Sequence, residues 1–158
     1  KRMWNVFDES GLFASACRHG LILWIADLVQ SGELAKYPLA IVDQALNVLG
    51  DRLLVGYDIG CSFSKTVANS QLGSKFKASR SRFCVNAFHG YSHNFTCQKE
   101  NHPNVIKGIG IEDLETLERV FSASNALASV TRNMSAYRRR VFIDLFFKQW
   151  DADKYANL

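Results

Sequence analysis

The chain has 158 residues, of which 47% are hydrophobic and 22% are charged, a composition typical of a globular domain and not of a disordered or fibrous protein. Its formal net charge of +4 permits a polyanionic partner without requiring one. The longest apolar run, residues 21–26, is too short to cross a bilayer, so we expect no membrane association.

Three successive strands, or a bent hairpin and a third strand, are predicted at the start of the chain. Residues 4–7 and 12–17 are apolar, and the turn-forming residues 8–11 separate them. Residues 21–29 form a third apolar run. Because this run is almost unbroken by polar residues, it predicts a strand that is buried on both faces.

The rest of the chain alternates helical and extended patterns. The predicted elements are a helix within residues 31–50 whose regular part starts near Pro38, a strand at 53–57, a basic helix or loop at 62–82, a short strand at 83–88 and a helical region from 111 to about 149. This order predicts an α/β fold in one domain over residues 1–158, with a mixed sheet flanked by helices and a long helical C-terminal part. A meander of three strands followed by alternating helices and parallel strands is the order of the ribonuclease-H-like fold.

One carboxylate, Asp58, follows the strand at 53–57 in a turn flanked by Gly56 and Gly60. Small residues at a strand end allow a ligand, a metal or another backbone to come close. The alternative is that Asp58 merely caps the helix that follows an ordinary strand-to-helix turn.

Two further carboxylates lie near the start of the last helical region. Leu114, Leu117 and Phe121 form its predicted inward stripe, and Glu118 lies beside them. A carboxylate next to a core stripe must find a partner or a cation. Glu115 lies at the margin of the stripe and can instead pair with the arginine four residues later.

His89, His93 and Cys97 are spaced four residues apart, so on a continuous helix they would share one face. Imidazole and thiolate are zinc ligands, which makes this a candidate structural Zn2+ site, and Cys17 with His19 could add ligands. The alternative is that His89 orients a neighbouring carboxylate while Cys97 packs in the core.

Basic residues gather in two stretches that could line a groove for a phosphate backbone. They are Lys75, Lys77, Arg80 and Arg82 in the first stretch, and Arg132, Arg138, Arg139 and Arg140 in the second. A solvated helix face is the alternative. The sequence contains no phosphate-binding glycine loop and no paired-histidine zinc protease motif, so it does not indicate nucleotide hydrolysis or that type of protease.

Four blocks of the sequence together carry a family resemblance. They are Phe7–Phe13 with Cys17–Gly20; Gly56–Cys61; Phe88–Asn94 with Cys97 and Gln98; and Gly110–Glu115 running on through Glu118–Leu127. In order and spacing these blocks resemble the transposase domain of the Kyakuja–Dileera–Zisupton family of fungal DNA transposons. The Glu-Arg-x-Phe-Ser element is also similar to one in hAT-type transposases, in which its Glu is a catalytic acid.

The resemblance implies a ribonuclease-H-like DDE transposase that works on DNA in the nucleus. Its two Asp and one Glu would hold divalent cations, normally Mg2+ and alternatively Mn2+. The second Asp corresponds to Asp58 and the Glu to Glu118, with Glu115 as the fallback. We expect Asp58, Glu118 and His89 to converge around one cation.

One departure from the family pattern concerns the first Asp of the triad, which lies on a strand upstream of the first block. Asp8 is a poor substitute because it is predicted in a turn between strands. The chain opens with Lys1, so we expect it to be a piece of a longer protein or a processed form. Loss of the first sheet strand would expose a sheet edge, through which copies of the chain could associate.

Three functions remain open from the sequence. The leading one is a metal-dependent DNA transposase core that cuts and joins phosphodiester bonds. The second is a catalytically inactive module derived from a transposase, which binds nucleic acid or a partner. The third is a general metal-dependent nuclease that uses the same carboxylates on DNA or RNA.

Overall fold

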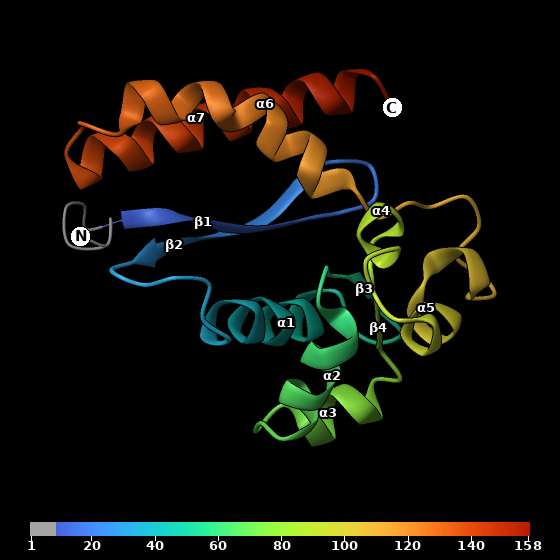
Figure 1. Ribbon diagram of the computed structural model, residues 1–158. Helices are drawn as coiled ribbons and strands as arrows, with labels where there is room; N and C mark the ends of the chain where they lie inside the picture. The colour runs from blue at the N-terminus through green and yellow to red at the C-terminus, as the bar shows by residue number, and fades with distance from the viewer. Residues whose placement is uncertain (1–8) are drawn as a thin grey trace. The chain divides into compact units, whose positions relative to one another are not determined.

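The computed structural model describes residues 9–158 and divides the chain into two compact units (Figure 1). The terminal unit comprises the part of residues 1–37 that is described together with 116–158, and the central unit comprises residues 38–115. The strand expected at residues 4–7 and the side chain of Asp8 lie outside the described residues.

The terminal unit contains an antiparallel pair of strands, β1 (Glu9–Ala16) and β2 (Ile22–Val29). The pairing shifts register near both ends of β1, where bulges bend the strand. The turn predicted over residues 8–11 is therefore wrong from Glu9 onward, because these residues pair with β2. Cross-strand hydrogen bonding here outweighs the turn preference of the local residues.

The prediction that the third apolar run is buried on both faces is also wrong. Leu23 and Ile25 of β2 are 36% and 38% exposed, whereas Ile22 packs into the hydrophobic core of the terminal unit. In this unit the helices cover one face of a two-stranded sheet, which is the arrangement expected for antiparallel strands.

Two long helices, α6 (Thr116–Thr131) and α7 (Ala136–Ala156), complete the terminal unit. They lie along β1 and β2 in Figure 1, and the single break between them agrees with the sequence prediction. Val120 of α6 and Ile143 and Phe147 of α7 form the buried core. The indole nitrogen of Trp150 donates to the backbone oxygen of Gly20 at 2.8 Å, which ties α7 to the β1–β2 turn.

An ion pair fixes the other part of α7 to the sheet. The guanidinium of Arg139 donates to the Asp27 carboxylate of β2, and both side chains are more than four-fifths buried. Arg140 contacts the same carboxylate at 3.0 Å, but its own side chain is 61% exposed. Its neighbour Arg138 is exposed.

Arg139→Ala is expected to destabilise the protein by about 1–3 kcal/mol, because hydrogen bonds to charged groups contribute in this range and Asp27 would lose a buried partner. Chemical denaturation followed by circular dichroism measures the change. Arg138→Ala is the matched control on the same helix, and its exposed side chain should cost less than about 0.5 kcal/mol. Equal losses for the two variants would contradict the structural role of Arg139.

The central unit is built around a β–α–β arrangement. Helix α1 (Lys36–Val48) precedes this arrangement in the chain. Strands β3 (Leu54–Gly56) and β4 (Arg82–Cys84) pair in parallel. The connection between the strands contains α2 (Gly60–Ala68) and α3 (Gly73–Ala78). Parallel neighbours require such a crossover, because a tight hairpin cannot join them.

The core of the central unit lies between α1, α2 and β4. Val42, Leu46, Phe63, Val67 and Phe83 are buried together, and the rings of Phe63 and Phe83 meet edge to face at 5.4 Å. The apolar residues of α1 and α2 recur four residues apart, so each helix buries one stripe in this core.

Three short helices follow β4: α4 (Ala87–Gly90), α5 (Phe95–Asn101) and the 3-10 turn η2 (Pro103–Val105). The continuous helix that would carry His89, His93 and Cys97 does not form, and His93 lies in the turn between α4 and α5. The Asn94 side chain accepts from the Cys97 amide at 2.9 Å and starts a new helix there.

The last helical region begins later than residue 111. Residues 111–115 are not helical, because Leu114 has a positive φ of 62° and the Asp113 carboxylate accepts from the Glu115 amide at 2.9 Å. Leu114 therefore does not belong to the inward stripe of α6. It packs on β3, where a β-carbon added to Gly56 would lie 2.8 Å from that of Leu114.

The prediction of an α/β fold with a long helical C-terminal part is confirmed. The strands of residues 9–158 form two separate two-stranded sheets, whereas a single mixed sheet was predicted. A search of the described helices finds none that is long and apolar enough to cross a membrane.

Candidate functional site

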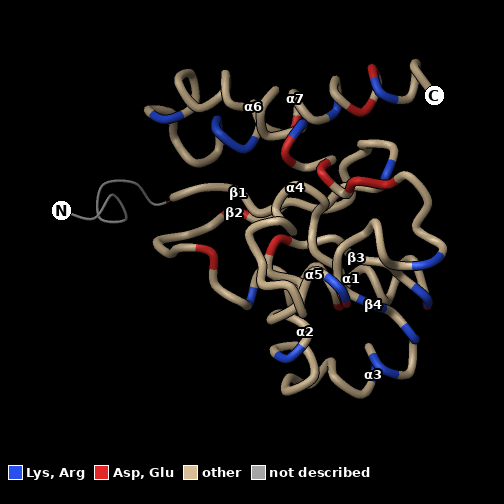
Figure 2. The backbone as a smooth tube through the Cα atoms, turned by 45° about the vertical axis from the view of Figure 1, so that its right-hand side comes forward, with Lys and Arg blue, Asp and Glu red and all other residues tan. Residues whose placement is uncertain are grey.

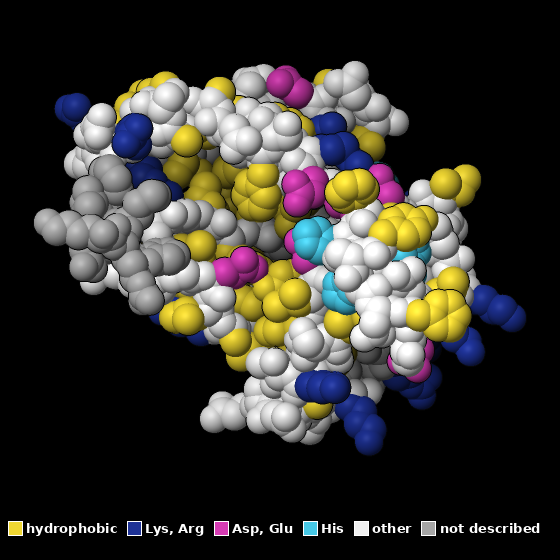
Figure 3. All heavy atoms as spheres, viewed as in Figure 1, with side chains coloured by type: hydrophobic (Ala, Val, Ile, Leu, Met, Phe, Trp, Pro, Cys, Tyr) yellow, Lys and Arg dark blue, Asp and Glu magenta, His cyan; other side chains and the backbone are white. Residues whose placement is uncertain are grey.

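The central unit brings Asp58 and His89 together at one sheet edge. Gly56 of β3 pairs with Cys84 of β4, and Asp58 follows two residues after the β3 end of this pair. His89 lies on α4, and its Nδ1 is 3.8 Å from Oδ2 of Asp58. The Asp58 side chain is 36% exposed, and the His89 side chain is 49% exposed. Acidic and histidine side chains are seen next to one another in Figure 3.

A close approach of two backbones positions Asp58. The Tyr57 amide donates to the Cys84 oxygen at 3.0 Å, and the Gly60 amide donates to the Tyr57 oxygen at 2.7 Å. A β-carbon at Gly60 would lie 2.4 Å from the Cys84 oxygen, so the turn holding Asp58 requires glycine there. The residue that precedes α2 is Ile59, and no side chain caps this helix start among the described residues, so Asp58 does not serve as its cap.

Asn86 follows two residues after the β4 end of the same strand pair and is only 8% exposed. Its side-chain oxygen has no hydrogen-bond partner among the described residues. A buried polar oxygen without a partner is costly and points to a donor or cation that completes it. Sequence reasoning missed Asn86; its place directly after a short apolar strand is the signal that could have found it.

The two candidate glutamates belong to different units. Glu115 lies in the central unit, and its Oε1 accepts from the Phe88 amide at 2.8 Å, so it holds the α4 helix that carries His89. Glu118 lies on the first turn of α6 in the terminal unit and is exposed. The expectation that Glu118 borders the buried stripe is therefore wrong, and its convergence with Asp58 stays a prediction.

His93 and Cys97 meet a third residue, Cys61, which sequence reasoning did not include. The Nδ1 of His93 is 3.4 Å from Sγ of Cys61 and 3.3 Å from Sγ of Cys97. His89 is not part of this group and pairs with Asp58, as the alternative interpretation of its role had it. Cys61 could have been found from its place three residues after Asp58, in the turn where the glycines already indicated a close approach.

Burial governs the ionisation of two of the thiols. It raises the pKa of Cys84, which is fully buried, to about 11, although the charge of Arg82 acts in the opposite direction. Burial also raises the pKa of Cys97, and the neighbouring Cys61 thiol adds to the rise. In the terminal unit, Sγ of Cys17 lies 4.0 Å from Nδ1 of His19. A part for these two residues in metal binding stays a prediction.

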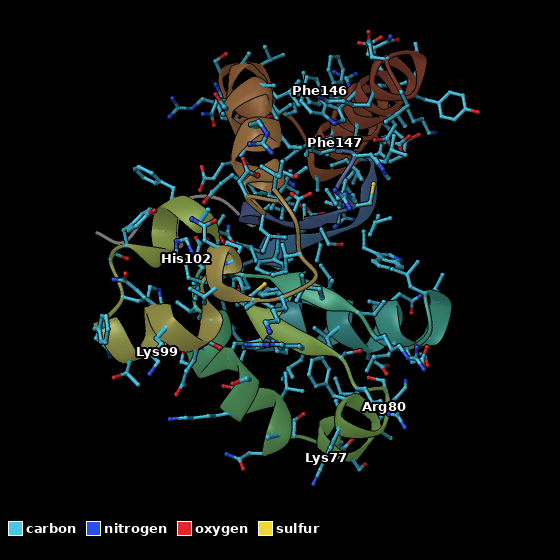
Figure 4. All side chains as sticks on the ribbon, turned by 90° about the vertical axis from the view of Figure 1, so that its right-hand side faces the viewer. Lys77, Arg80, Lys99, His102, Phe146 and Phe147 are labelled. Atoms are coloured by element: carbon cyan, nitrogen blue, oxygen red, sulfur yellow. The ribbon has the colours of Figure 1, made fainter. Side chains whose placement is uncertain are left out.

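The predicted basic residues differ in their availability. In the central unit, Lys75 contacts Asp43 at 2.7 Å and Arg82 donates to the Glu100 backbone, whereas Lys77 and Arg80 are exposed (Figure 4). Figure 2 marks the Lys and Arg positions along the backbone in blue. In the terminal unit, Arg139 is held by Asp27. The exposed residues Arg132, Arg138 and Arg140 complete that set. A role for the exposed cations in binding nucleic acid stays a prediction.

The comparisons with known proteins agree with the resemblance. A model of the Kyakuja–Dileera–Zisupton transposase family matches residues 1–151. No curated protein and no solved structure matches the chain. The family match spans nearly all of the sequence, including the turn with Asp58 and the α4–α5 segment. The chain therefore belongs to the Kyakuja–Dileera–Zisupton transposase family.

Proposed function

We propose that this chain is the catalytic core of a metal-dependent DNA transposase with a ribonuclease-H-like fold. The observation that carries the proposal is the Asp58–His89 pair, with 3.8 Å between Nδ1 and Oδ2, at the carboxyl end of β3. In open α/β sheets, ligands bind in the crevice beyond the carboxyl ends of the parallel strands. Glu118 is the proposed acid of the Glu-Arg-x-Phe-Ser element, with Glu115 as the fallback.

The donor set fits Mg2+ or Mn2+. These cations prefer oxygen ligands and usually take one or two carboxylates, with waters and substrate phosphates completing the shell. Asp58 offers a partly exposed carboxylate, and Asn86 offers an unpartnered carbonyl oxygen after the neighbouring strand. When bound, such cations supply activation of the attacking oxygen and stabilisation of the leaving oxygen of a phosphodiester.

In this reaction, the chain's own residues would position the reacting groups and transfer protons. His89 lies 3.8 Å from the Asp58 carboxylate, too far for a hydrogen bond but close enough to attract that carboxylate when the ring is protonated, and a histidine ring can accept or donate a proton. Glu115 acts through another residue, because its carboxylate fixes the backbone of α4 at Phe88 and thereby the position of His89. The exposed Lys77 and Arg80 would contribute attraction to the phosphate backbone.

The other parts of the proposal rest on the family. Transposases act on DNA, so we propose DNA as the partner, the nucleus as the place of action and a fungal mobile element as the source. Self-association of the chain through an exposed sheet edge is a further part of the proposal.

A second candidate function is a nucleic-acid-binding module without catalysis. The observation that favours it is the ligand grouping: within the described residues, the cluster that could hold a metal consists of Cys61, His93 and Cys97 and contains no carboxylate. A module that retained the fold while losing a carboxylate of the triad would bind DNA and leave it uncut.

Incubation of the chain with supercoiled plasmid DNA and with RNA, in Mg2+, Mn2+ or EDTA, tests these functions. The transposase proposal predicts metal-dependent nicking or joining of DNA, with RNA left intact. Equal cleavage of RNA would favour the general nuclease. A gel shift of DNA without any cleavage in either metal would contradict the catalytic proposal and favour the binding module.

A further inference from the structure

Cys61, His93 and Cys97 form a group of metal-binding side chains in the central unit. Cys61 lies in the first turn of α2, His93 in the turn between α4 and α5, and Cys97 in the first turn of α5. Their ligand atoms all lie within 4.8 Å of one another. Both sulfur atoms approach the same nitrogen, Nδ1 of His93, at 3.4 and 3.3 Å.

These distances are close to those of an assembled zinc site. With Zn–S near 2.3 Å and Zn–N near 2.0 Å, tetrahedral geometry separates a sulfur and a nitrogen ligand by about 3.5 Å. The two sulfur–nitrogen separations of 3.4 and 3.3 Å are therefore within a few tenths of an ångström of those in a tetrahedral site. Two thiols and an imidazole favour zinc over Mg2+, which prefers oxygen ligands. Three protein ligands leave a fourth position for a water molecule or an external ligand.

Neighbouring groups hold the ligands in place. The Asn101 side chain donates to Sγ of Cys97 at 3.7 Å, and the Gln98 side chain donates to the backbone oxygen of His93 at 2.6 Å. The Asn94 side chain accepts from the Cys97 amide at 2.9 Å. Hydrogen bonds of this kind orient metal ligands and raise the affinity of a site.

His102, a further histidine near this group, already has hydrogen-bond partners at both ring nitrogens. It is 4% exposed, its Nε2 lies 2.9 Å from the Ala87 oxygen and its Nδ1 accepts from the Asn104 amide (Figure 4). His102 therefore serves as a buried support for α4, and the group of three is complete without it.

We propose that Cys61, His93 and Cys97 bind one Zn2+ ion in the central unit. The ion would join α2, which begins just after Asp58, to the α4–α5 segment, which carries His89. It would thereby fix the two segments that hold the Asp58–His89 pair. The zinc site is independent of whether the chain cuts DNA, so it goes beyond the proposed function.

The test is a metal titration of the chain, stripped of metal under reducing conditions, with Zn2+ and with Co2+ as a spectroscopic substitute. We expect about one ion per chain, and for Co2+ the strong visible bands of a tetrahedral site together with a thiolate charge-transfer band. Cys61→Ser and Cys97→Ser should weaken binding at least 100-fold, because even the loss of an outer-shell partner costs about 10- to 100-fold.

Matched controls separate this site from the other cysteines and histidines. Cys17→Ser removes a thiol of the terminal unit and should leave the titration unchanged. His93→Asn should abolish binding, whereas His89→Asn should retain it. Unchanged zinc affinity in Cys61→Ser or Cys97→Ser, or no zinc binding by the wild-type chain, would overturn the proposal.

If the variants fail to fold, a measurement on the wild-type chain still tests the proposal. Zn2+ should protect Cys61 and Cys97 from alkylation by N-ethylmaleimide, read out by mass spectrometry, while Cys17 continues to react. Equal alkylation with and without zinc would overturn the proposal, as would a Cys61–Cys97 disulfide that forms in preference to zinc binding. The zinc titration and the alkylation assay contain no DNA, so their outcome does not depend on cleavage. A chain that binds zinc in these assays but leaves plasmid DNA uncut in the cleavage assay would contradict only the proposed function.

Discussion

Asp58→Asn should reduce metal-dependent cleavage of plasmid DNA at least about 100-fold, since it removes the charge of the proposed metal ligand. Asparagine keeps the size and a carbonyl oxygen of the side chain, so the turn after β3 is retained. The measurement is the rate of plasmid nicking in Mg2+ and in Mn2+, with the melting temperature of each variant recorded to show that the fold is intact.

Asp51→Asn is the matched control for this prediction. Asp51 precedes β3 in the same unit, its side chain is 70% exposed, and its contact is with the exposed Arg52 at 4.0 Å. The substitution makes the same change of charge and should leave cleavage unchanged, because exposed ion pairs contribute little. Full activity in Asp58→Asn would reject the assignment of Asp58 as a metal ligand, whereas equal losses in both variants would indicate a general effect of charge on DNA binding.

Gly60→Ala should destabilise the protein by about 2–3 kcal/mol, because the added β-carbon would lie 2.4 Å from the backbone oxygen of Cys84. The obstacle is backbone, and the same oxygen accepts from the Tyr57 amide, so it cannot move aside without breaking the contact after β3 and β4. Local preference predicts the opposite sign, since alanine is a better helix former than glycine by up to about 1 kcal/mol. Denaturation in urea measures the difference.

Ser62→Ala is the control for the helix effect. Ser62 is exposed in the first turn of the same helix, where its hydroxyl donates to the Ile59 oxygen at 3.0 Å. Its replacement should change stability by less than about 0.5 kcal/mol. A Gly60→Ala variant as stable as the wild type would show that the backbones of α2 and β4 can separate. In that case, the close approach would not fix the position of Asp58.

Local sequence patterns identified the elements that position the site. The apolar run before Gly56 predicted strand β3. The glycines at 56 and 60 predicted close approaches, which Leu114 makes at Gly56 and the β4 backbone makes at Gly60. The break between α6 and α7 was also expected. These features depend on a few neighbouring residues, so hydrophobic period and backbone freedom are enough to predict them.

Prediction failed where distant contacts compete with local preference. The spacing of His89, His93 and Cys97 indicated one helical face, but His102 lies directly against Gly90, and Asn94 starts a new helix at α5. The chain therefore turns at His93, which moves His89 to Asp58 and joins His93 and Cys97 to Cys61. The late start of α6 has a similar cause, because Leu114 packs on Gly56 and the turn at Asp113 replaces the first helical turn.

By itself, the sequence determined an α/β protein with its carboxylate Asp58 at a strand end, and the order and spacing of four sequence blocks determined the family resemblance that the family match confirms. Only the tertiary structure decided which of the arginines are buried in ion pairs and which cysteines and histidines come together. Arg138 and Arg139 are neighbours in the sequence, yet only Arg139 is buried against Asp27, 112 residues away. Cys61 likewise meets His93 from 32 residues away. Such partnerships arise when packing brings separate segments together, and no local period records them.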